Sequence, residues 1–391
     1  MAYLEQIGFL ILIGIAAWFI YKRVSFISKN IKMGQDYKPE GPSGERFRKM
    51  MLLAFGQKKM FDKPIAGIMH FVIYIGFVLI NIEVLEIILD GIFGTHRLFA
   101  PLLGSFYNFL INFFELLALG VVIACVVFLF RRNVMSIGRF HKREMKGWPK
   151  LDANLILVIE IALMFAILSM NANDQILQAK GADHYMETGT LYISAALIPL
   201  YDGLSMQMNI ILERFFWWIH IAGIFAFAVY ITYSKHLHIF MAFPNTYFSN
   251  LFPKGKIKNM DDITSEVKIM LGMEQPQGDA APPSSFGAQD INQLSWKNLM
   301  DAYSCTECGR CTAECPANIT GKKLSPRKIM MDTRDRMEDA GKNGLDNGKK
   351  LLGDYIQEEE IMACTSCNAC VEACPVSINP LEIILELRRY K

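Results

Sequence analysis

Five stretches of the 391-residue chain are long and apolar enough to cross a membrane, and they constrain its fold more than any other feature. A helix needs about 20 mainly apolar residues to span about 30 Å of hydrocarbon. No basic residue precedes the first stretch and no small-residue cleavage site follows it, so we expect an uncleaved anchor rather than a signal peptide. The sequence therefore predicts a five-helix transmembrane bundle within residues 1–245. The stretches are Leu4–Tyr21, Ile65–Leu89, Leu102–Phe130, Leu151–Met170 and Glu213–Tyr233.

Lysine and arginine are distributed unevenly between the loops that join these stretches. The loops Lys22–Lys63 and Arg131–Lys150 hold eleven and seven of them, whereas the other two loops hold only Arg97 and Lys180. Basic loops stay in the cytoplasm. We therefore expect a multi-pass protein of the cytoplasmic (inner) membrane, with its N-terminus outside and everything after the fifth helix in the cytoplasm. The outer loop Asn171–Leu212 is long enough to fold over the outer mouth of the bundle.

Eight of the nine cysteines lie after residue 300, in two copies of one motif. The copies are Cys305-x2-Cys308-x2-Cys311-x3-Cys315-Pro316 and Cys364-x2-Cys367-x2-Cys370-x3-Cys374-Pro375. Three thiolates at this spacing bind three corners of one [4Fe–4S] cubane, and the fourth reaches the neighbouring cluster. A zinc site uses four ligands in two pairs, which this doubled pattern does not match. The predicted ligand sets are Cys305, Cys308, Cys311 and Cys374 for the first cluster, and Cys364, Cys367, Cys370 and Cys315 for the second.

The chain around these motifs has the periodicity of helices and little alternation of β-branched residues. We expect helices at Gln293–Tyr303, Leu324–Ala340 and Leu351–Cys364. The overall prediction is an all-α protein in which a linker, residues 246–295, joins the membrane domain to an α-helical dicluster domain, residues 296–391. Within the linker, Gln275–Gly287 is rich in proline, glycine, serine and alanine and is typical of a flexible connector.

Three histidines on the predicted membrane helices are candidates for haem ligands, because histidine in lipid is costly and usually functional. His70 lies near the cytoplasmic end of the second helix. His220 and His238 are eighteen residues apart, which in one continuous fifth helix puts them on one face five turns apart. His70 and His238 then lie at the same depth, as the two axial ligands of one b-type haem must. The alternative for each histidine is an interhelical hydrogen-bonding role.

His220 lacks a partner for a second haem, because Ile80, Asn81 and Glu83 occupy the matching part of the second helix. His96 and His184 could serve only if the outer loops fold inward. Two acidic residues, Glu115 and Glu160, lie deep in the third and fourth predicted helices. Each is either a relay for protons or a hydrogen-bonded residue between helices. Cys125, in an apolar run, is interpreted as a small buried hydrophobe.

The membrane half resembles the cytochrome b (gamma) subunit of respiratory nitrate reductase in helix number, topology and the positions of His70, His220 and His238. The cysteine half resembles the α-helical ferredoxin domain of heterodisulfide reductase C-like proteins. Together they resemble membrane-bound, heterodisulfide-reductase-like iron–sulfur oxidoreductases. Single-chain relatives in this group carry a further cysteine-rich CCG domain, whereas this sequence stops at Lys391. The resemblance thus implies a separate cytoplasmic partner, either a CCG-domain (heterodisulfide reductase B-like) protein or an electron-transfer flavoprotein.

The resemblance implies a function in electron transfer between that partner and menaquinone or another quinone, through two [4Fe–4S] clusters and a b-type haem. No motif for nucleotide binding, nucleophilic catalysis or flavin binding is present, so any catalytic centre is expected on another chain. A net charge of +2 gives no indication of nucleic-acid binding. The alternative function is a membrane-anchored iron–sulfur redox sensor or assembly protein without quinone activity, for which haem ligands on two helices would have no use.

Overall fold

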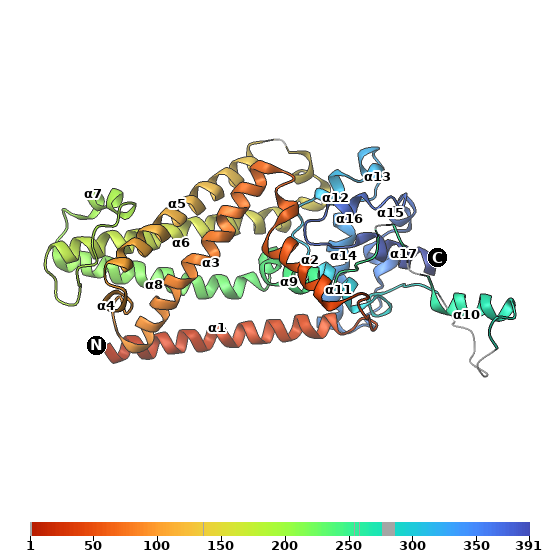
Figure 1. The fold of residues 1–391 in the computed structure, drawn as a ribbon, viewed down its shortest axis with the longest axis horizontal. Helices are drawn as coiled ribbons and strands as arrows, with labels where there is room; N and C mark the ends of the chain where they lie inside the picture. Colours follow the sequence, from red (N-terminus) through yellow and green to blue (C-terminus); the bar gives the residue numbers. More distant parts are fainter. Residues whose placement is uncertain (1, 136, 254, 258, 276–285) are drawn as a thin grey trace. The chain divides into compact units, whose positions relative to one another are not determined.

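The structure is a computed structural model that describes residues 2–135, 137–253, 255–257, 259–275 and 286–391. Most of the expected connector Gln275–Gly287 lies outside these residues. The secondary structure of the described residues consists of helices, and β-pairing among them is limited to isolated bridges. These residues divide into two compact units, a helical unit of residues 1–25 and 60–237, and a second unit of residues 26–59 and 238–391. The helices are labelled in Figure 1.

Five helices are long and apolar enough to cross a membrane, as the sequence predicts. Two of the segments that connect them contain a short helix, α4 (Ala100–Leu103) in one and α7 (Ile198–Tyr201) in the other. Large apolar side chains on all five long helices are exposed, as expected for surfaces that contact lipid. The long helices are α1 (Ala2–Ile31), α3 (Pro64–Phe93), α5 (Ser105–Asn133), α6 (Trp148–Ala179) and α8 (Met206–Ile231).

Local signals explain where several of these helices begin and end. Pro64 occupies the first turn of α3, where its missing N–H has no helical partner to lose. Gly94 ends the same helix in the left-handed conformation at φ 71°, which glycine adopts without strain. Ser205 caps α8 by accepting a hydrogen bond from the Met208 backbone N–H at 3.2 Å.

In the helical unit α6 packs against α8 and α5, and α5 packs against α3. An apolar cluster that includes Phe9 of α1, Ile87 of α3 and Ile221 of α8 fills the space between helices. The sequence predicts a fourth span that stops at Met170, but α6 continues to Ala179. This extra segment is polar and buried, so its side chains bond within the protein instead of facing lipid.

The second unit contains ten α-helices among its described residues, and α11 packs against both α9 and α14. Ser325 caps α14 and Asn379 caps α17, each through its side chain. The helices are α2 (Ser43–Met50), α9 (His238–Tyr247), α10 (Asp261–Met270), α11 (Trp296–Ser304), α12 (Arg310–Ala313), α13 (Pro316–Ile319), α14 (Pro326–Asn343), α15 (Glu358–Met362), α16 (Ala369–Ala373) and α17 (Pro380–Tyr390).

The segment Phe26–Lys59 groups with the dicluster region rather than with the membrane helices, a division that the predicted boundary at residue 245 does not anticipate. The backbone of Gln35 exchanges hydrogen bonds with Leu294 O at 2.7 Å and with Trp296 N at 2.9 Å. Gly34 permits this approach, since a Cβ there would lie 2.7 Å from Trp296 N. Asn30 Nδ2 also donates to the Tyr303 hydroxyl at 2.8 Å.

Two expected helices are interrupted in the structure. The helix predicted over Leu351–Cys364 is a single wide turn, Leu351–Tyr355, followed by α15, because Gly353 adopts φ 109°. The fifth membrane helix ends at Ile231, and α9 begins only at His238 after a 3-10 turn. Asp152 on α6 contributes to this break, since its Oδ2 accepts the Lys235 backbone N–H at 3.2 Å.

A buried ion pair anchors the core of the second unit. The Arg336 guanidinium, with a fully buried side chain, donates to Asp290 from Nε at 2.9 Å and from Nη2 at 2.7 Å. Asp290 Oδ1 also accepts the Leu351 backbone N–H at 3.1 Å. One carboxylate therefore joins α14 to two loop segments far apart in the sequence.

Replacing Arg336 with methionine should lower the free energy of unfolding by about 3 kcal/mol, because it leaves the buried Asp290 carboxylate with only the more distant Lys350, at 3.8 Å, as a charged partner. Replacing Arg389, whose pair with Glu386 is more exposed, should cost less than about 1 kcal/mol. Denaturant unfolding of the detergent-solubilised protein, followed by visible cluster absorbance, measures both. Equal unfolding midpoints for the two variants would contradict this assignment.

Candidate functional site

The two cysteine motifs have the same backbone conformation. Glu307 and Ser366, each two residues after the first cysteine of its motif, have φ 56° and 55°. Gly309 and Asn368, two residues further on, have φ 72° and 61°. Left-handed residues at these matched positions turn each loop sharply. A short helix then follows in each copy, α12 in the first and α16 in the second, and these two helices pack together.

The structure brings together the cysteines that the spacing assigns to the second cluster. One small cavity is lined by Cys315 of the first motif and by Cys364, Cys367 and Cys370 of the second. Apolar walls complete the cavity, provided by Leu324, Pro326, Leu381 and Ile384. A thiol from one motif thus joins three from the other, which is the crossed arrangement that two adjacent cubanes require.

The remaining cysteines form the other group. Burial, together with the neighbouring thiols of Cys308 and Cys305, raises the pKa of Cys374 to about 12. Burial likewise raises the pKa of Cys305 to about 12. Cys374 of the second motif therefore lies beside the cysteines of the first. Among the described residues, no group of three or more His, Cys, Asp or Glu side chains is arranged to hold a single metal ion.

The cysteines within each group differ in exposure to solvent. Cys305 is buried, and Glu307 beside it accepts a hydrogen bond from Arg334 Nη2 at 2.7 Å. Cys367, in the other group, is exposed. Backbone N–H groups donate to sulfur in both groups, from Ser366 to Cys364 Sγ at 3.4 Å and from Ile378 to Cys374 Sγ at 3.3 Å. Such bonds and the degree of solvent exposure both tune the potential of an iron–sulfur cluster.

The candidate haem ligands fall in different parts of the structure. His70 lies on α3 in the helical unit, and His238 is the first residue of α9 in the second unit, so their pairing remains a prediction. The premise of one continuous helix from His220 to His238 was wrong, because α8 ends at Ile231. The five-turn spacing therefore carries no information about the relative directions of these two side chains.

His220 has the hydrogen-bonding pattern of a metal-binding histidine. Its side chain is buried on α8, and its Nδ1 lies 2.9 Å from the carbonyl oxygen of Leu163 on α6. A carbonyl accepts only, so Nδ1 carries the proton. Nε2 then has a free lone pair, and it is buried without a hydrogen-bond partner among the described residues. This orientation is the one that a neighbouring carbonyl imposes on histidine ligands.

The two candidate proton-relay residues differ in their surroundings. Glu160, on α6, has no hydrogen-bond partner within the part of the chain that the structure describes, and Cys125 of α5 lies near it. Glu115, on α5, accepts hydrogen bonds from Asn171 Nδ2 at 3.1 Å, from the Ser194 hydroxyl, and from the Ile193 and Ser194 backbone N–H groups at 3.1 Å. Glu115 thus fits the alternative interpretation of a hydrogen-bonded residue, whereas Glu160 remains a relay candidate.

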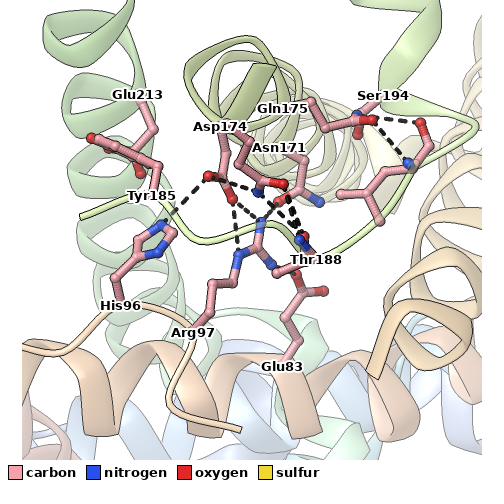
Figure 2. A network of polar contacts seen from close by, with 12 residues as sticks. Glu83, His96, Arg97, Asn171, Asp174, Gln175, Tyr185, Thr188, Ser194 and Glu213 are labelled. Atoms are coloured by element: carbon pink, nitrogen blue, oxygen red, sulfur yellow. Dashed lines mark hydrogen bonds and ion pairs between the residues drawn. The ribbon is translucent and has the colours of Figure 1, made fainter. Parts of the chain in front are cut away.

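A buried polar network at the end of the helical unit was not identified from the sequence. Figure 2 shows Arg97 at its centre, between Glu83 and Asp174. Arg97 donates to Asp174 Oδ2 from Nε at 3.0 Å and from Nη2 at 2.7 Å, and Nη2 also donates to Asn171 Oδ1 at 2.7 Å. Its Nη1 donates to the Tyr107 hydroxyl at 3.3 Å and lies 3.8 Å from Glu83 Oε1.

The spacing of polar residues along two helices is the sequence feature that could have indicated this network. Acidic residues three and four positions apart share one face of α3, namely Glu83, Glu86 and Asp90. The same spacing recurs on the polar end of α6, at Asn171, Asp174 and Gln178. Two such faces on membrane helices predict a shared cationic partner. In the count of lysine and arginine residues per loop, Arg97 is only one positive charge, so that count gives no indication that its side chain is buried in a network.

Replacing Cys315 with serine should remove the cluster bound mainly by the second motif, and replacing Cys374 should remove the other. Each variant should therefore lose about half of the eight irons and eight sulfides expected for two cubanes. Iron and acid-labile sulfide are assayed on anaerobically purified protein, with Cys125→Ser as the matched control that keeps both clusters. Four irons in the unmodified protein, or stoichiometric zinc, would contradict the assignment.

Residues 304–378 match the family described as the 4Fe-4S dicluster domain. The chain is 28% identical to the "Probable iron-sulfur-binding oxidoreductase FadF" of Bacillus subtilis, over 98% of this chain and 55% of that protein. It is 26% identical to the "EtfAB:quinone oxidoreductase" of Syntrophomonas wolfei, over 88% of this chain and 48% of that protein. The chain thus spans about half the length of these curated relatives. No solved structure matches it.

The dicluster region also matches shorter stretches of other redox proteins. It is 38% identical to the C-type component of the ferredoxin- and F(420)H(2)-dependent CoB-CoM heterodisulfide reductase of Methanosarcina acetivorans, over 26% of this chain and 53% of that protein. The predicted resemblance to heterodisulfide reductase C-like proteins is confirmed, whereas the detailed likeness to the nitrate reductase gamma protein remains a prediction. The chain is a relative of iron–sulfur oxidoreductases, with a [4Fe–4S] dicluster domain and five membrane-capable helices.

Proposed function

We propose that this chain is the electron-transfer subunit of a membrane-bound oxidoreductase, passing electrons between a cytoplasmic redox partner and the membrane quinone pool. The observation that carries the proposal is the crossed set of thiols, in which Cys315 shares a cavity with Cys364, Cys367 and Cys370. Two clusters linked in this way form a relay for single electrons. Five membrane-capable helices in the same chain favour a lipid-soluble partner at the other end of that relay.

The soluble partner docks beside the cluster bound by Cys364, Cys367, Cys370 and Cys315. Cys367 is the one exposed cysteine of the eight, so this cluster has a ligand at the surface that another protein can approach. Ile319, one turn after Cys315, and Met362, just before Cys364, are also exposed, at 68% and 49%. Apolar side chains around an exposed redox centre suit a docking surface. The occupant is a CCG-domain protein or an electron-transfer flavoprotein, which the description of the Syntrophomonas relative favours.

A b-type haem would supply single-electron transfer inside the membrane. We assign His70 and His238 to one such haem at the cytoplasmic end of the helices. His220 is the candidate for a second haem, because its bonded Nδ1 and unpartnered Nε2 suit an axial ligand. The proposed orientation has the N-terminus outside and the clusters in the cytoplasm, as the lysine and arginine distribution of the loops favours.

The alternative function is a membrane-anchored redox sensor or assembly factor. An anchor gains nothing from a buried imidazole nitrogen that lacks a partner, because burying an unpaired polar group costs about 1 to 3 kcal/mol. Nor does it need Glu160 without a hydrogen-bond partner, among the described residues, on a membrane-capable helix. Both features favour electron and proton transfer over simple anchoring.

Replacing His70 or His238 with alanine should abolish the dithionite-reduced b-type haem bands and leave the iron–sulfur absorbance intact. The reason is that haem iron held by one axial histidine loses its low-spin spectrum. His220→Ala tests the second haem in the same assay, and His141→Ala, at an exposed residue between α5 and α6, is the matched control. Full haem spectra in both the His70 and His238 variants would show that the ligands are wrong.

Replacing Glu160 with glutamine should slow menaquinone-analogue reduction by about tenfold or more, as loss of a general acid or base does. Haem and cluster spectra should be unchanged. Glu187→Gln, on an exposed loop, is the matched control. Turnover at the wild-type rate in Glu160→Gln would remove this residue from the mechanism.

A further inference from the structure

A cavity of about 510 Å³ lies at the end of the helical unit, between the loop after α3 and the loop after α6. Its walls include His96, Arg97, Leu98, Pro101, Tyr185 and Met186. This volume is in the range of pockets that hold small organic ligands. Neither the cluster relay nor the proposed haem ligands account for it.

His96 lines this cavity and has a buried ring nitrogen that no described residue uses. Its side chain is only 9% exposed, and its Nε2 lies 3.6 Å from Asp174 Oδ1, as Figure 2 shows. Its Nδ1 is buried and has no hydrogen-bond partner among the described residues. The ring packs edge-on against Tyr185, with centroids 5.0 Å apart. A polar atom held in this way is positioned for a ligand that the protein itself does not supply.

The neighbours of His96 decide which kind of hydrogen bond Nδ1 offers. Burial lowers the pKa of His96 to about 4, against the opposing effect of Asp174, so the ring is neutral near pH 7. Asp174 accepts hydrogen bonds from Arg97 and Gln178, so it faces Nε2 as an acceptor. The single imidazole proton then lies on Nε2, and Nδ1 is left as an acceptor. The ligand must therefore supply an O–H or N–H donor.

The charges around the cavity exclude an anionic head group. Arg97 is the only lysine or arginine among the described residues that line it, and its guanidinium is already bonded to Asp174, Asn171 and Tyr107. Glu83 and Glu86 are buried near the same guanidinium. A phosphate or carboxylate would therefore find no uncommitted lysine or arginine among the described residues that line the cavity.

The rim of the cavity is apolar. Leu98, Pro101 and Met186 line it, and the neighbouring side chains Phe93 and Leu102 are 62% and 77% exposed. Exposed apolar residues at the ends of membrane-capable helices suit contact with the lipid interface. The site therefore combines a polar acceptor inside with an apolar exit, which matches a neutral amphiphile with a hydroxylated ring and a hydrocarbon tail.

We propose that this cavity binds the head group of a quinol, whose hydroxyl donates a hydrogen bond to His96 Nδ1 while its tail leaves past Phe93 and Leu102. The proposal rests on the proposed function, in which quinone is the lipid-soluble partner. Asp174 acts as a positioning residue that keeps the His96 proton on Nε2. The hydroxylated ring stacks against the aromatic wall formed by His96 and Tyr185.

The test uses 2-heptyl-4-hydroxyquinoline N-oxide, a flat hydroxylated ring with an apolar tail, whose fluorescence is quenched on binding. The unmodified protein in detergent should bind one equivalent saturably. His96→Ala should weaken binding by about tenfold, the effect of one lost hydrogen bond to a buried group. His96→Gln should retain most of the affinity, because its amide oxygen can accept the same bond. The matched control His141→Ala should bind as the unmodified protein does.

A second variant keeps the test decisive if His96→Ala fails to fold. Met186→Trp fills the cavity from a side chain that is 43% exposed, so it should weaken probe binding without disturbing the buried network. Unchanged binding in both Met186→Trp and any folded His96 variant, in protein that still reacts with a menaquinone analogue, would place the quinol site elsewhere and leave the proposed function standing. An unmodified protein that neither binds the probe nor reacts with the analogue would overturn the proposed function itself. Displacement of the probe by phosphatidylglycerol at equal concentration would assign the cavity to lipid and overturn the inference.

Discussion

A single buried guanidinium organises the end of the helical unit. Arg97 lies in the loop after α3, yet it bonds to Asp174 and Asn171 on α6 and to Tyr107 on α5. Its own backbone N–H donates to Asp90 at 2.9 Å, so the loop is held at both its backbone and its side chain. A buried arginine must satisfy five N–H donors, and this demand fixes the helices around it.

The second unit also has a buried arginine that bonds to several segments of the chain. Arg336 of α14 is fully buried and bonds to Asp290, which in turn accepts the Leu351 backbone N–H. Arg97 thus holds the loop that lines the cavity in one unit, and Arg336 holds α14 to the segments around Asp290 and Leu351 in the other. Rigid supports of this kind hold redox and binding sites in position, since a loop without such anchors is mobile on its own.

The repeat in the dicluster region shows how much local chemistry specifies. Residues two and four positions after the first cysteine are left-handed in both motifs, although only one of the four, Gly309, is glycine. Glu307, Ser366 and Asn368 adopt a conformation that costs non-glycine residues about 1 kcal/mol each. Binding of a cluster would offset that strain. The crossed position of Cys315 follows from the packing of α12 against α16, which brings the end of one motif to the start of the other.

The sequence alone predicted the five apolar helices, the all-α character and the two cysteine motifs, because hydrophobic length and ligand spacing are local properties of a chain. Prediction from the sequence failed where a residue far away in the chain determines the local structure. The helix that was to align His220 with His238 is interrupted at Ile231, since Asp152 on another helix accepts the Lys235 backbone N–H. Glu115 holds a loop in place only because the hydroxyl of Ser194, seventy-nine residues later in the chain, donates a hydrogen bond to it. The network around Arg97 and the free nitrogen of His96 likewise depend on which side chains become neighbours, and only the tertiary structure decides that.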